Sequence, residues 1–417
     1  MELTTQQNKV FEQIKVFLKS DASVFILRGY AGTGKTTMVK VIADYIKQSR
    51  KLVMMAPTGR AARVLNKKTG HDAVTIHKAI YGKAHVQPKK VKDVAESEFK
   101  FVFPINQSEN GGNIVAIVDE ASMVCSRKIE HELFMFGTDN QMDDLLTFVR
   151  PNFGGKVIFV GDPAQLPPVG ESVSNALRAE YFQEKGLKVI EAELTEVLRQ
   201  KNDSVILKNA MMIRDLLKKD KRNQLVFEEQ KDDVEMVPSE QFLDKYLKYR
   251  KESGRHDSVI ICFSNKSANR YNRDIRKALY GGDVPLREND ILLITQNNYR
   301  LGLMNGEFVP VLSVGARTQQ SAPVYAQIGG KKERIVITLN FIQVTVPDSN
   351  GNPKPCMLLE DLLTSDKATI SIDENRALYI NFCMRHPDLK QDTEAFAEAL
   401  LNDVYYNAIR AKYGYAV

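Results

Sequence analysis

The chain predicts an α/β fold in which helices cover both faces of a parallel, doubly wound sheet. Four short apolar runs, VFILRG, LVMMAP, IVAIVDE and KVIFVGD, recur in the first 200 residues, with helical stretches such as residues 37–49 between them. Because each run is almost continuously apolar, we expect strands that are buried on both faces. Right-handed crossovers place the loops after these strands at one edge of the sheet, where ligands bind.

Composition sets the class of protein. The 417 residues are 43% hydrophobic and 26% charged, which excludes a disordered chain, a collagen and a disulfide miniprotein. At about 150 residues per domain, we expect two to four domains. The 58 basic residues exceed the 52 acidic ones, giving a net charge of +6 that permits a nucleic-acid partner.

Cysteine, histidine and apolar patterns exclude other classes. Four widely spaced cysteines, without a CxxC pair, predict reduced thiols, and the six histidines form no zinc motif. No apolar stretch approaches the roughly 18 residues that cross a bilayer. The polar start MELTTQQNKVFEQ has no secretory core. We therefore expect a cytoplasmic protein with no membrane partner and no structural zinc.

A phosphate-binding loop is the strongest motif. GYAGTGKTT at residues 29–37 matches GxxxxGK[ST], and it lies between a strand and a helix, the context that confirms the motif. Its glycines allow backbone N–H groups to surround a polyphosphate at the helix N-terminus. Lys35 can reach the β- and γ-phosphates, and the Thr36 hydroxyl can ligate Mg²⁺. The expected loop residues are Gly29, Gly32, Thr33, Gly34, Lys35, Thr36 and Thr37.

Polar residues at the ends of the next strands fit phosphate chemistry. Asp119 and Glu120 would be costly if buried unpaired, but beside a phosphate loop Asp119 would hold Mg²⁺ and Glu120 would accept a proton from the attacking water. The alternative is an acidic loop end that caps a helix. Gln165, in VGDPAQLPPVG, is placed to orient water or to contact the γ-phosphate, unless it is an ordinary loop amide.

Arg199, in LTEVLRQ, is a further candidate for the γ-phosphate. A guanidinium that reaches this phosphate from another structural unit would link phosphate state to domain closure. A surface arginine is an equal alternative.

These motifs, with APTGRAA (residues 56–62) and TIH (residues 75–77), occur in the order seen in superfamily 1B DNA helicases, and the chain resembles the RecD/Dda/PIF group. The resemblance implies two RecA-like domains with parallel sheets, ATP between them, and 5′-to-3′ movement on single-stranded DNA. It implies an ATPase set of Lys35, Thr36, Asp119, Glu120, Gln165 and Arg199, and an adenine-reading glutamine, Gln7. It implies DNA contacts at Pro57, Thr58, Arg60, Thr75, His77, Asn265, Lys266 and Asn305. Without the resemblance, Gln7 would be a solvated residue and His77 a packed or capping one.

The resemblance also predicts the domains. We expect RecA-like domain 1 at residues 1–79 and 114–200, an inserted wedge at 80–113, an incomplete RecA-like domain 2 at 201–304, a β-rich, SH3-like insertion at 305–376, and a returning helical segment at 377–417. In the wedge, Phe99, Phe101 or Phe103 would stack on a base, unless they pack in the core. Two basic runs would contact phosphates or form solvated helix faces: residues 208–222, and the cluster Lys266, Arg270, Arg273, Arg276 and Lys277.

The expected function is an ATP-dependent 5′-to-3′ DNA helicase of repair or recombination, monomeric, acting on single-stranded and 5′-tailed duplex DNA with ATP and Mg²⁺. THKAQG-like and VxxTR-like motifs of the family are not found before the final YGYAV. We therefore expect either a longer natural protein or a truncated form with weak or no unwinding. The alternative is a nucleotide-gated DNA-binding subunit of a recombination or nuclease complex that does not itself unwind DNA.

Overall fold

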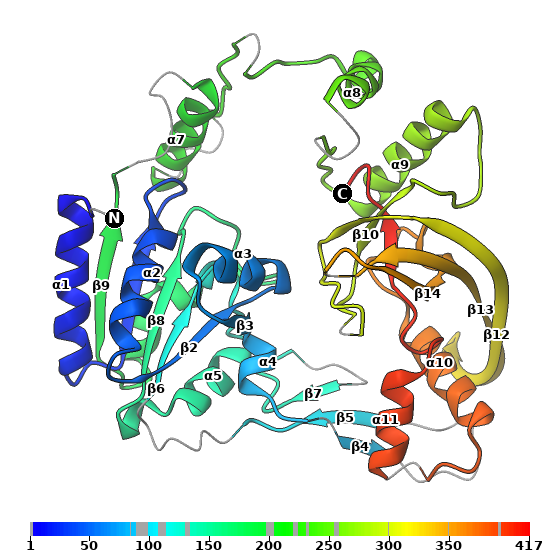
Figure 1. Ribbon diagram of the computed structural model, residues 1–417, viewed down its shortest axis with the longest axis horizontal. Coiled ribbons are helices and arrows are strands. Elements are labelled where there is room, and N and C mark those ends of the chain that lie inside the picture. Colours follow the sequence, from blue (N-terminus) through cyan, green and yellow to red (C-terminus); the bar gives the residue numbers. More distant parts are fainter. Residues whose placement is uncertain are drawn as a thin grey trace. The chain divides into compact units, whose positions relative to one another are not determined.

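The computed structural model describes residues 3–83, 85–88, 99–106, 114–129, 134–196, 204–219, 224–230, 233–253, 258–298, 300–348, 350–390 and 393–417. The chain divides into two compact units (Figure 1). The first comprises Met1–Lys83, Phe103–His131 and Met135–Val237, and the second Ala84–Val102, Glu132–Phe134 and Pro238–Val417.

A six-stranded parallel sheet forms the centre of the first unit, in the order β3-β2-β6-β8-β1-β9. The four apolar runs form strands, as predicted. Two further strands extend the sheet at its edges. The strands are β1 (Val24–Gly29), β2 (Lys51–Ala56), β3 (Ala73–Thr75), β6 (Ile114–Val118), β8 (Lys156–Gly161) and β9 (Val189–Leu194). The α/β class with a parallel sheet is confirmed.

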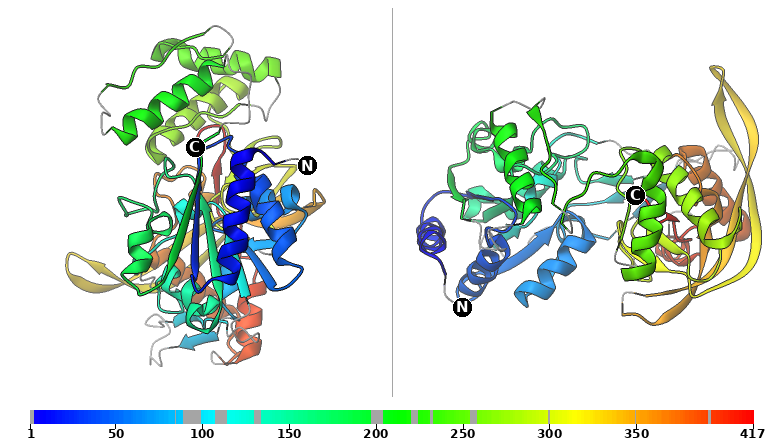
Figure 2. Two further views of the ribbon diagram at one scale, coloured as in Figure 1. Left: turned by 90° about the vertical axis from the view of Figure 1, so that its left-hand side faces the viewer. Right: turned by 90° about the horizontal axis from the view of Figure 1, so that it is seen from above.

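Helices bury both faces of this sheet (Figure 2). Along β1, Val24 and Ile26 face one core, and Phe25 and Leu27 face the other. The core of Phe25 also contains residues of α1 (Thr5–Lys19), α2 (Lys35–Ile46) and α3 (Gly59–Thr69). The core of Val24 contains residues of α4 (Ile76–Ile80), α5 (Gln141–Val149) and α6 (Ala179–Gln183). Burial on two faces explains why these strands have no polar alternation.

A small sheet of order β4-β5-β7 lies in the predicted wedge region and just beyond it. β4 (His85–Pro88) and β5 (Phe99–Phe103) are antiparallel, and β7 (Phe134–Phe136) completes the sheet. The first unit also contains α7 (Val205–Lys218), which covers part of the basic run at residues 208–222, and the segment that returns from it.

The second unit contains two antiparallel three-stranded sheets and four helices. One sheet joins β11 (Phe308–Pro310), β10 (Ile291–Ile294) and β15 (Ala411–Tyr413), and the other joins β12 (Ser313–Ile328), β13 (Lys331–Pro347) and β14 (Pro353–Leu359). The helices are α8 (Ser239–Ser253), α9 (Asn265–Tyr280), α10 (Ile372–Arg385) and α11 (Glu394–Asn402). The β-rich pattern expected after residue 305 is therefore present.

Two segments of this unit differ from what their residue patterns predict. The apolar run SVIICFS, at residues 258–264, is typical of a strand, but it contributes only an isolated parallel bridge between Ile260 and Ala416. Residues 393–413 do not continue as one helix, because the Asp403 carboxylate accepts hydrogen bonds from the N–H groups of Tyr405 and Tyr406 and turns the chain. The following residues then pair as β15 with β10.

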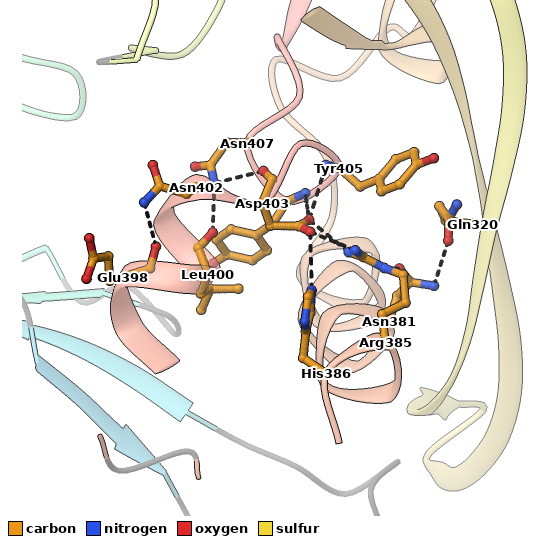
Figure 3. Close-up of polar contacts among 11 residues, drawn as sticks. Gln320, Asn381, Arg385, His386, Glu398, Leu400, Asn402, Asp403, Tyr405 and Asn407 are labelled. Atoms are coloured by element: carbon orange, nitrogen blue, oxygen red, sulfur yellow. Dashed lines mark hydrogen bonds and ion pairs between the residues drawn. The ribbon is translucent and has the colours of Figure 1, made fainter. Parts of the chain in front are cut away.

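Figure 3 shows how Asp403 also ties this turn to α10. Its oxygens accept two hydrogen bonds from the Arg385 guanidinium, at 2.7 and 2.8 Å, and Nε2 of His386 lies 3.9 Å away. Arg385 also donates to the Asn381 side chain at 2.9 Å. In the part of the chain that the structure describes, no helix is long and apolar enough to cross a membrane.

Candidate active site

The loop between β1 and α2 has the backbone of an anion site. Gly32 and Gly34 take φ values of 85° and 83°, in the left-handed region that favours glycine. A Cβ on Gly29 would lie 2.8 Å from Oγ1 of Thr33, so this position also requires glycine. No described side chain caps α2, so the N–H groups of its first turn can bind an anion.

Lys35 lies inside the curve of this loop. Its Nζ donates to the carbonyl oxygens of Gly29 at 2.6 Å and Tyr30 at 3.0 Å. Thr36 and Thr37 follow it in the first turn of α2 and are partly exposed. The lysine and the hydroxyls therefore lie where a polyphosphate would meet the helix N-terminus.

Asp119 and Glu120 follow β6, at the carboxyl edge of the same sheet. Burial, and to a lesser extent the charge of Glu120, raise the pKa of the Asp119 carboxyl to about 6, whereas the charge of Lys35 acts in the opposite direction. Lys35 is thus close enough to act on Asp119 electrostatically. The motif residues from β1 and β6 therefore form one site.

Glu120 is held in an unusual state. Its φ of 51° is left-handed, which is strained for a glutamate. Its Oε2 is buried and has no hydrogen-bond partner among the described residues. An unpaired carboxylate oxygen is costly, so it points to a water or a cation that completes the site.

The oxygen donors of Thr36 and Asp119 suit Mg²⁺. Within the described ranges, no group of three or more His, Cys, Asp or Glu residues could hold a metal alone. Mg²⁺ commonly keeps waters and binds substrate phosphates in addition to one or two protein ligands, so this donor set fits the ion.

Gln165 is exposed in the loop after β8, and its Oε1 accepts a hydrogen bond from Oγ of Ser122 at 3.0 Å. Ser122 is fully buried, two residues after Glu120. Sequence reasoning missed Ser122, although its place directly after the acidic pair was a usable signal. This bond links the loop that carries the carboxylates to the loop that carries the glutamine.

Gln7 is 3% exposed, so the interpretation as a solvated residue is wrong. Its Oε1 accepts from the Thr4 N–H in a capping box, and its Nε2 lies 3.5 Å from the Thr33 carbonyl oxygen of the phosphate loop. Gln6 instead accepts hydrogen bonds from Thr195 and Glu196, directly after β9. Arg199 lies outside the described residues, so its expected role stays a prediction.

The residues predicted to contact DNA in the first unit lie after β2 and β3, which are neighbours: Ala56 pairs with Thr75. Thr75 also caps α4. His77 packs on Phe136, with ring centroids 5.1 Å apart, and its Nδ1 lies 3.2 Å from the Gln141 amide nitrogen. The packed histidine that the residues alone suggested is observed. Pro57 and Thr58 follow β2 and are partly buried, and Thr58 caps α3. Arg60, in the first turn of α3, is exposed.

In the second unit, Asn265 and Lys266 are exposed in the first turn of α9, and Asn305 is exposed in a turn before β11. Nζ of Lys412 donates to the Asn265 side chain at 3.3 Å. These positions are open to a ligand, and their DNA contacts stay predictions.

The basic cluster on α9 requires one correction. Arg276 is buried, and it forms an ion pair with Asp290 at 2.9 Å, so it cannot contact phosphates. Its periodic spacing on the helix placed it on the inner face, where a buried carboxylate compensates its charge. Lys266, Arg270, Arg273 and Lys277 are exposed.

The phenylalanines considered for the wedge are packed where they are described. Phe101 is 2% exposed, and its ring lies 6.4 Å from that of Tyr406. Phe103 stacks on Phe136 with centroids 4.6 Å apart. The side chain of Phe99 lies outside the described part of the structure. Phe101 and Phe103 therefore pack against other aromatic rings of the protein, which was the alternative to stacking on a base.

Comparisons with known proteins identify the family of the chain. The sequence model of a family described as AAA domain matches residues 2–238, more than half of the chain. The ATP-dependent RecD2 DNA helicase of Deinococcus radiodurans is 32% identical over 169 residues, 40% of this chain and 18% of the relative. The ATP-dependent DNA helicase dda of Enterobacteria phage T4 is 25% identical over 316 residues, 73% of this chain and 64% of the relative.

An uncharacterized protein of Methanocaldococcus jannaschii is 35% identical over 155 residues, 35% of this chain and 12% of the relative. The chain thus spans between 12% and 64% of the length of these curated relatives. A solved structure of Pif1 helicases on forked duplex DNA has 20% identity and a TM-score of 0.45, covering 85% of this chain and 76% of that one. The chain therefore belongs to the AAA domain family, and it groups with the RecD- and Dda-like members of superfamily 1B, as its motifs predict.

Proposed function

We propose that the protein is an ATP-dependent DNA helicase that moves 5′ to 3′ on single-stranded DNA and opens 5′-tailed duplexes, with ATP and Mg²⁺ as cofactors. One observation carries the proposal: Lys35 lies within electrostatic reach of an Asp119 whose pKa is raised to about 6, beside the unpartnered Oε2 of Glu120. The RecD2 and dda relatives support the nucleic-acid half of the proposal by their names.

The residues divide the chemistry of ATP hydrolysis among themselves. The N–H groups of the glycine loop hold the polyphosphate, and Lys35 exchanges its bonds to Gly29 and Tyr30 for bonds to phosphate oxygens. Thr36 and Asp119 would hold Mg²⁺, and the bound ion would neutralise charge on the phosphates. The unpartnered oxygen of Glu120 accepts a proton from the attacking water.

Gln165 orients that water, and Ser122 positions the Gln165 amide through its hydrogen bond. Arg199 adds a positive charge at the γ-phosphate. ATP binding and hydrolysis then alternate two states with different affinities for DNA, and that difference drives movement. The DNA contacts come from the residues predicted for them: those after β2, those at the end of β3 and in α4, those in the first turn of α9, and Asn305. We propose that the protein acts as a monomer, in the cytoplasm, in DNA repair or recombination.

Lys35→Ala tests the proposal. We expect DNA-stimulated ATP hydrolysis to fall by about 100-fold or more, because a preorganised cation at the transferred phosphate is lost. Single-stranded DNA binding should stay within about twofold of the wild type, because phosphate contacts elsewhere supply it. Lys40→Ala, an exposed lysine of the same helix, is the matched control.

Unchanged turnover in Lys35→Ala would remove the phosphate loop from the mechanism. If the protein hydrolyses ATP in response to DNA but opens no 5′-tailed duplex, even when extended by any coding sequence beyond Val417, the nucleotide-gated subunit is the correct function instead.

A further inference from the structure

An arginine outside the helicase motifs lies on the phosphate loop. Cζ of Arg214, in α7, is 3.7 Å from the centroid of the Tyr30 ring. Tyr30 is the second residue of the loop and is 4% exposed. Both residues belong to the first unit, in which α7 lies beyond the end of the sheet that carries the loop (Figure 1).

Tyr30 connects this guanidinium to the centre of the site. Its carbonyl oxygen accepts hydrogen bonds from Nζ of Lys35 at 3.0 Å and from Oγ1 of Thr33 at 2.8 Å. In phosphate loops the lysine contacts the β- and γ-phosphates. The guanidinium stacked on the Tyr30 ring is therefore a second positive charge beside the phosphate loop.

The guanidinium has no carboxylate partner in the described part of the chain; the contact recorded for it there is the Tyr30 ring. A cation on an aromatic face keeps its N–H groups available at the ring's edge. Since no described carboxylate is paired with it, its field acts on any ligand that enters the loop.

Hydrogen bonds join α7, the helix that carries Arg214, to the segment that follows it. Oδ2 of Asp233 accepts hydrogen bonds from the Val205 N–H at 2.8 Å and the Ser204 hydroxyl at 3.1 Å, at the start of the helix. One turn later, Asn209 pairs with the backbone of Glu228 through two hydrogen bonds of 2.8 and 2.9 Å. These bonds hold the helix against the returning segment, and Arg214 contacts Tyr30 from the turn of α7 that follows.

We propose that Arg214 is a positioning and specificity-determining residue that makes the loop prefer a nucleoside triphosphate to the diphosphate. It acts through Tyr30, which holds its charge near the terminal phosphate. The triphosphate carries more negative charge at that end, so it gains more from the guanidinium than the diphosphate does. This inference rests on the proposed nucleotide site, and it adds a residue that selects between the substrate and the product of hydrolysis.

Equilibrium binding of Mg²⁺ with ADP and with a non-hydrolysable ATP analogue, without DNA, tests the inference on the full chain. In Arg214→Gln, which loses the charge but keeps a planar group, we expect affinity for the ATP analogue to fall about tenfold and affinity for ADP to change by less than about twofold. Arg214→Lys keeps the charge and should restore most of the preference. Lys208→Gln removes an exposed charge of the same helix and should change neither affinity.

Tyr30→Leu provides an independent variant, because it keeps the Arg214 side chain but removes the ring that holds its guanidinium. We expect the same loss of preference, whereas Tyr30→Phe should keep it. If Arg214→Gln and Tyr30→Leu weaken both nucleotides equally, or neither, the inference is overturned and the contact only packs α7 on the loop. A wild type that binds neither nucleotide overturns the proposed function, and the inference fails with it.

Discussion

The carboxyl of Asp119 is costly to the ligand-free fold. Burial raises its pKa to about 6, from an ordinary value of 3.8, so the fold binds its proton more tightly than the unfolded chain does. The stability from that proton is fully present below pH 3.8 and is lost as the pH rises through about 6. At neutral pH the carboxylate is therefore a net cost, which a bound cation would offset.

We predict that Asp119→Asn stabilises the nucleotide-free protein at pH 7.5. A pKa unit corresponds to about 1.4 kcal/mol, so we expect a gain of about 2 kcal/mol in the free energy of unfolding, because solvent still reaches part of the side chain. The gain should shrink towards zero near pH 4, where the wild-type carboxyl is protonated. Urea unfolding at both pH values measures it.

Asp72→Asn, an exposed carboxylate of the same unit, is the control and should change stability little at either pH. Asp119→Asn should have a second effect: although it gains stability, it should lose Mg²⁺-dependent ATP hydrolysis. A less stable Asp119→Asn at pH 7.5 would mean that the carboxylate is favourably paired in the free protein.

Single residues show what a sequence can predict about this site. Lys35 and Asp119 are predictable because glycine spacing and strand ends constrain them locally. The left-handed φ of Glu120 and the bond from Ser122 to Gln165 depend on two loops that the fold brings together, 43 residues apart in sequence. Arg276 was misplaced because its fate depends on Asp290, a partner that periodicity does not reveal.

At the level of elements, α10 and α11 are joined by one buried ion pair. The side chain of Asp403 is 5% exposed and that of Arg385 is 29% exposed. Asp403 also accepts hydrogen bonds from the backbone N–H groups of Tyr405 and Tyr406, in the turn that follows α11 (Figure 3). Removing one partner of a buried pair leaves the other charge uncompensated.

We predict that Asp403→Asn lowers the free energy of unfolding of the second unit by about 3 kcal/mol. Hydrogen exchange of the α10 and α11 amides in urea measures the change. Asp373 forms an ion pair with Arg376 in α10 and is more exposed than Asp403. Asp373→Asn should therefore lower the free energy of unfolding by no more than about 0.5 kcal/mol. Equal losses in the two variants would show that the Arg385 pair contributes no more than a surface pair.

The same segment shows where element prediction ends. β1, β2, β6 and β8 could be predicted because burial on both faces makes each run apolar. β15 is three residues long, AKY, and forms only because β10 lies beside it. A short strand that depends on a distant partner has little signal in its own residues. The helical segment predicted at residues 377–417 was therefore wrongly extended over β15.

Among the described residues, each of the two units has large hydrophobic clusters of its own. The two clusters that cover the six-stranded sheet draw on residues of the first unit, and the clusters around Leu292 and Phe341 draw on the second. Each unit thus has a hydrophobic core of its own, as expected of a domain. A ligand that binds one unit then stabilises that unit directly by mass action.

We predict that a Mg²⁺-bound ATP analogue protects the first unit alone from hydrogen exchange in the absence of DNA. At about 100 times its dissociation constant, the ligand adds about 2.7 kcal/mol, so exchange of the core amides of β1, β6 and β8 should slow by about 100-fold. The amides of β13 should exchange at an unchanged rate, because their core contains no residue of the nucleotide site. Lys35→Ala should abolish the protection, since it removes the cation of the loop. Equal protection of β13 would mean that the two units unfold together, and the separate cores would not then define separate folding units.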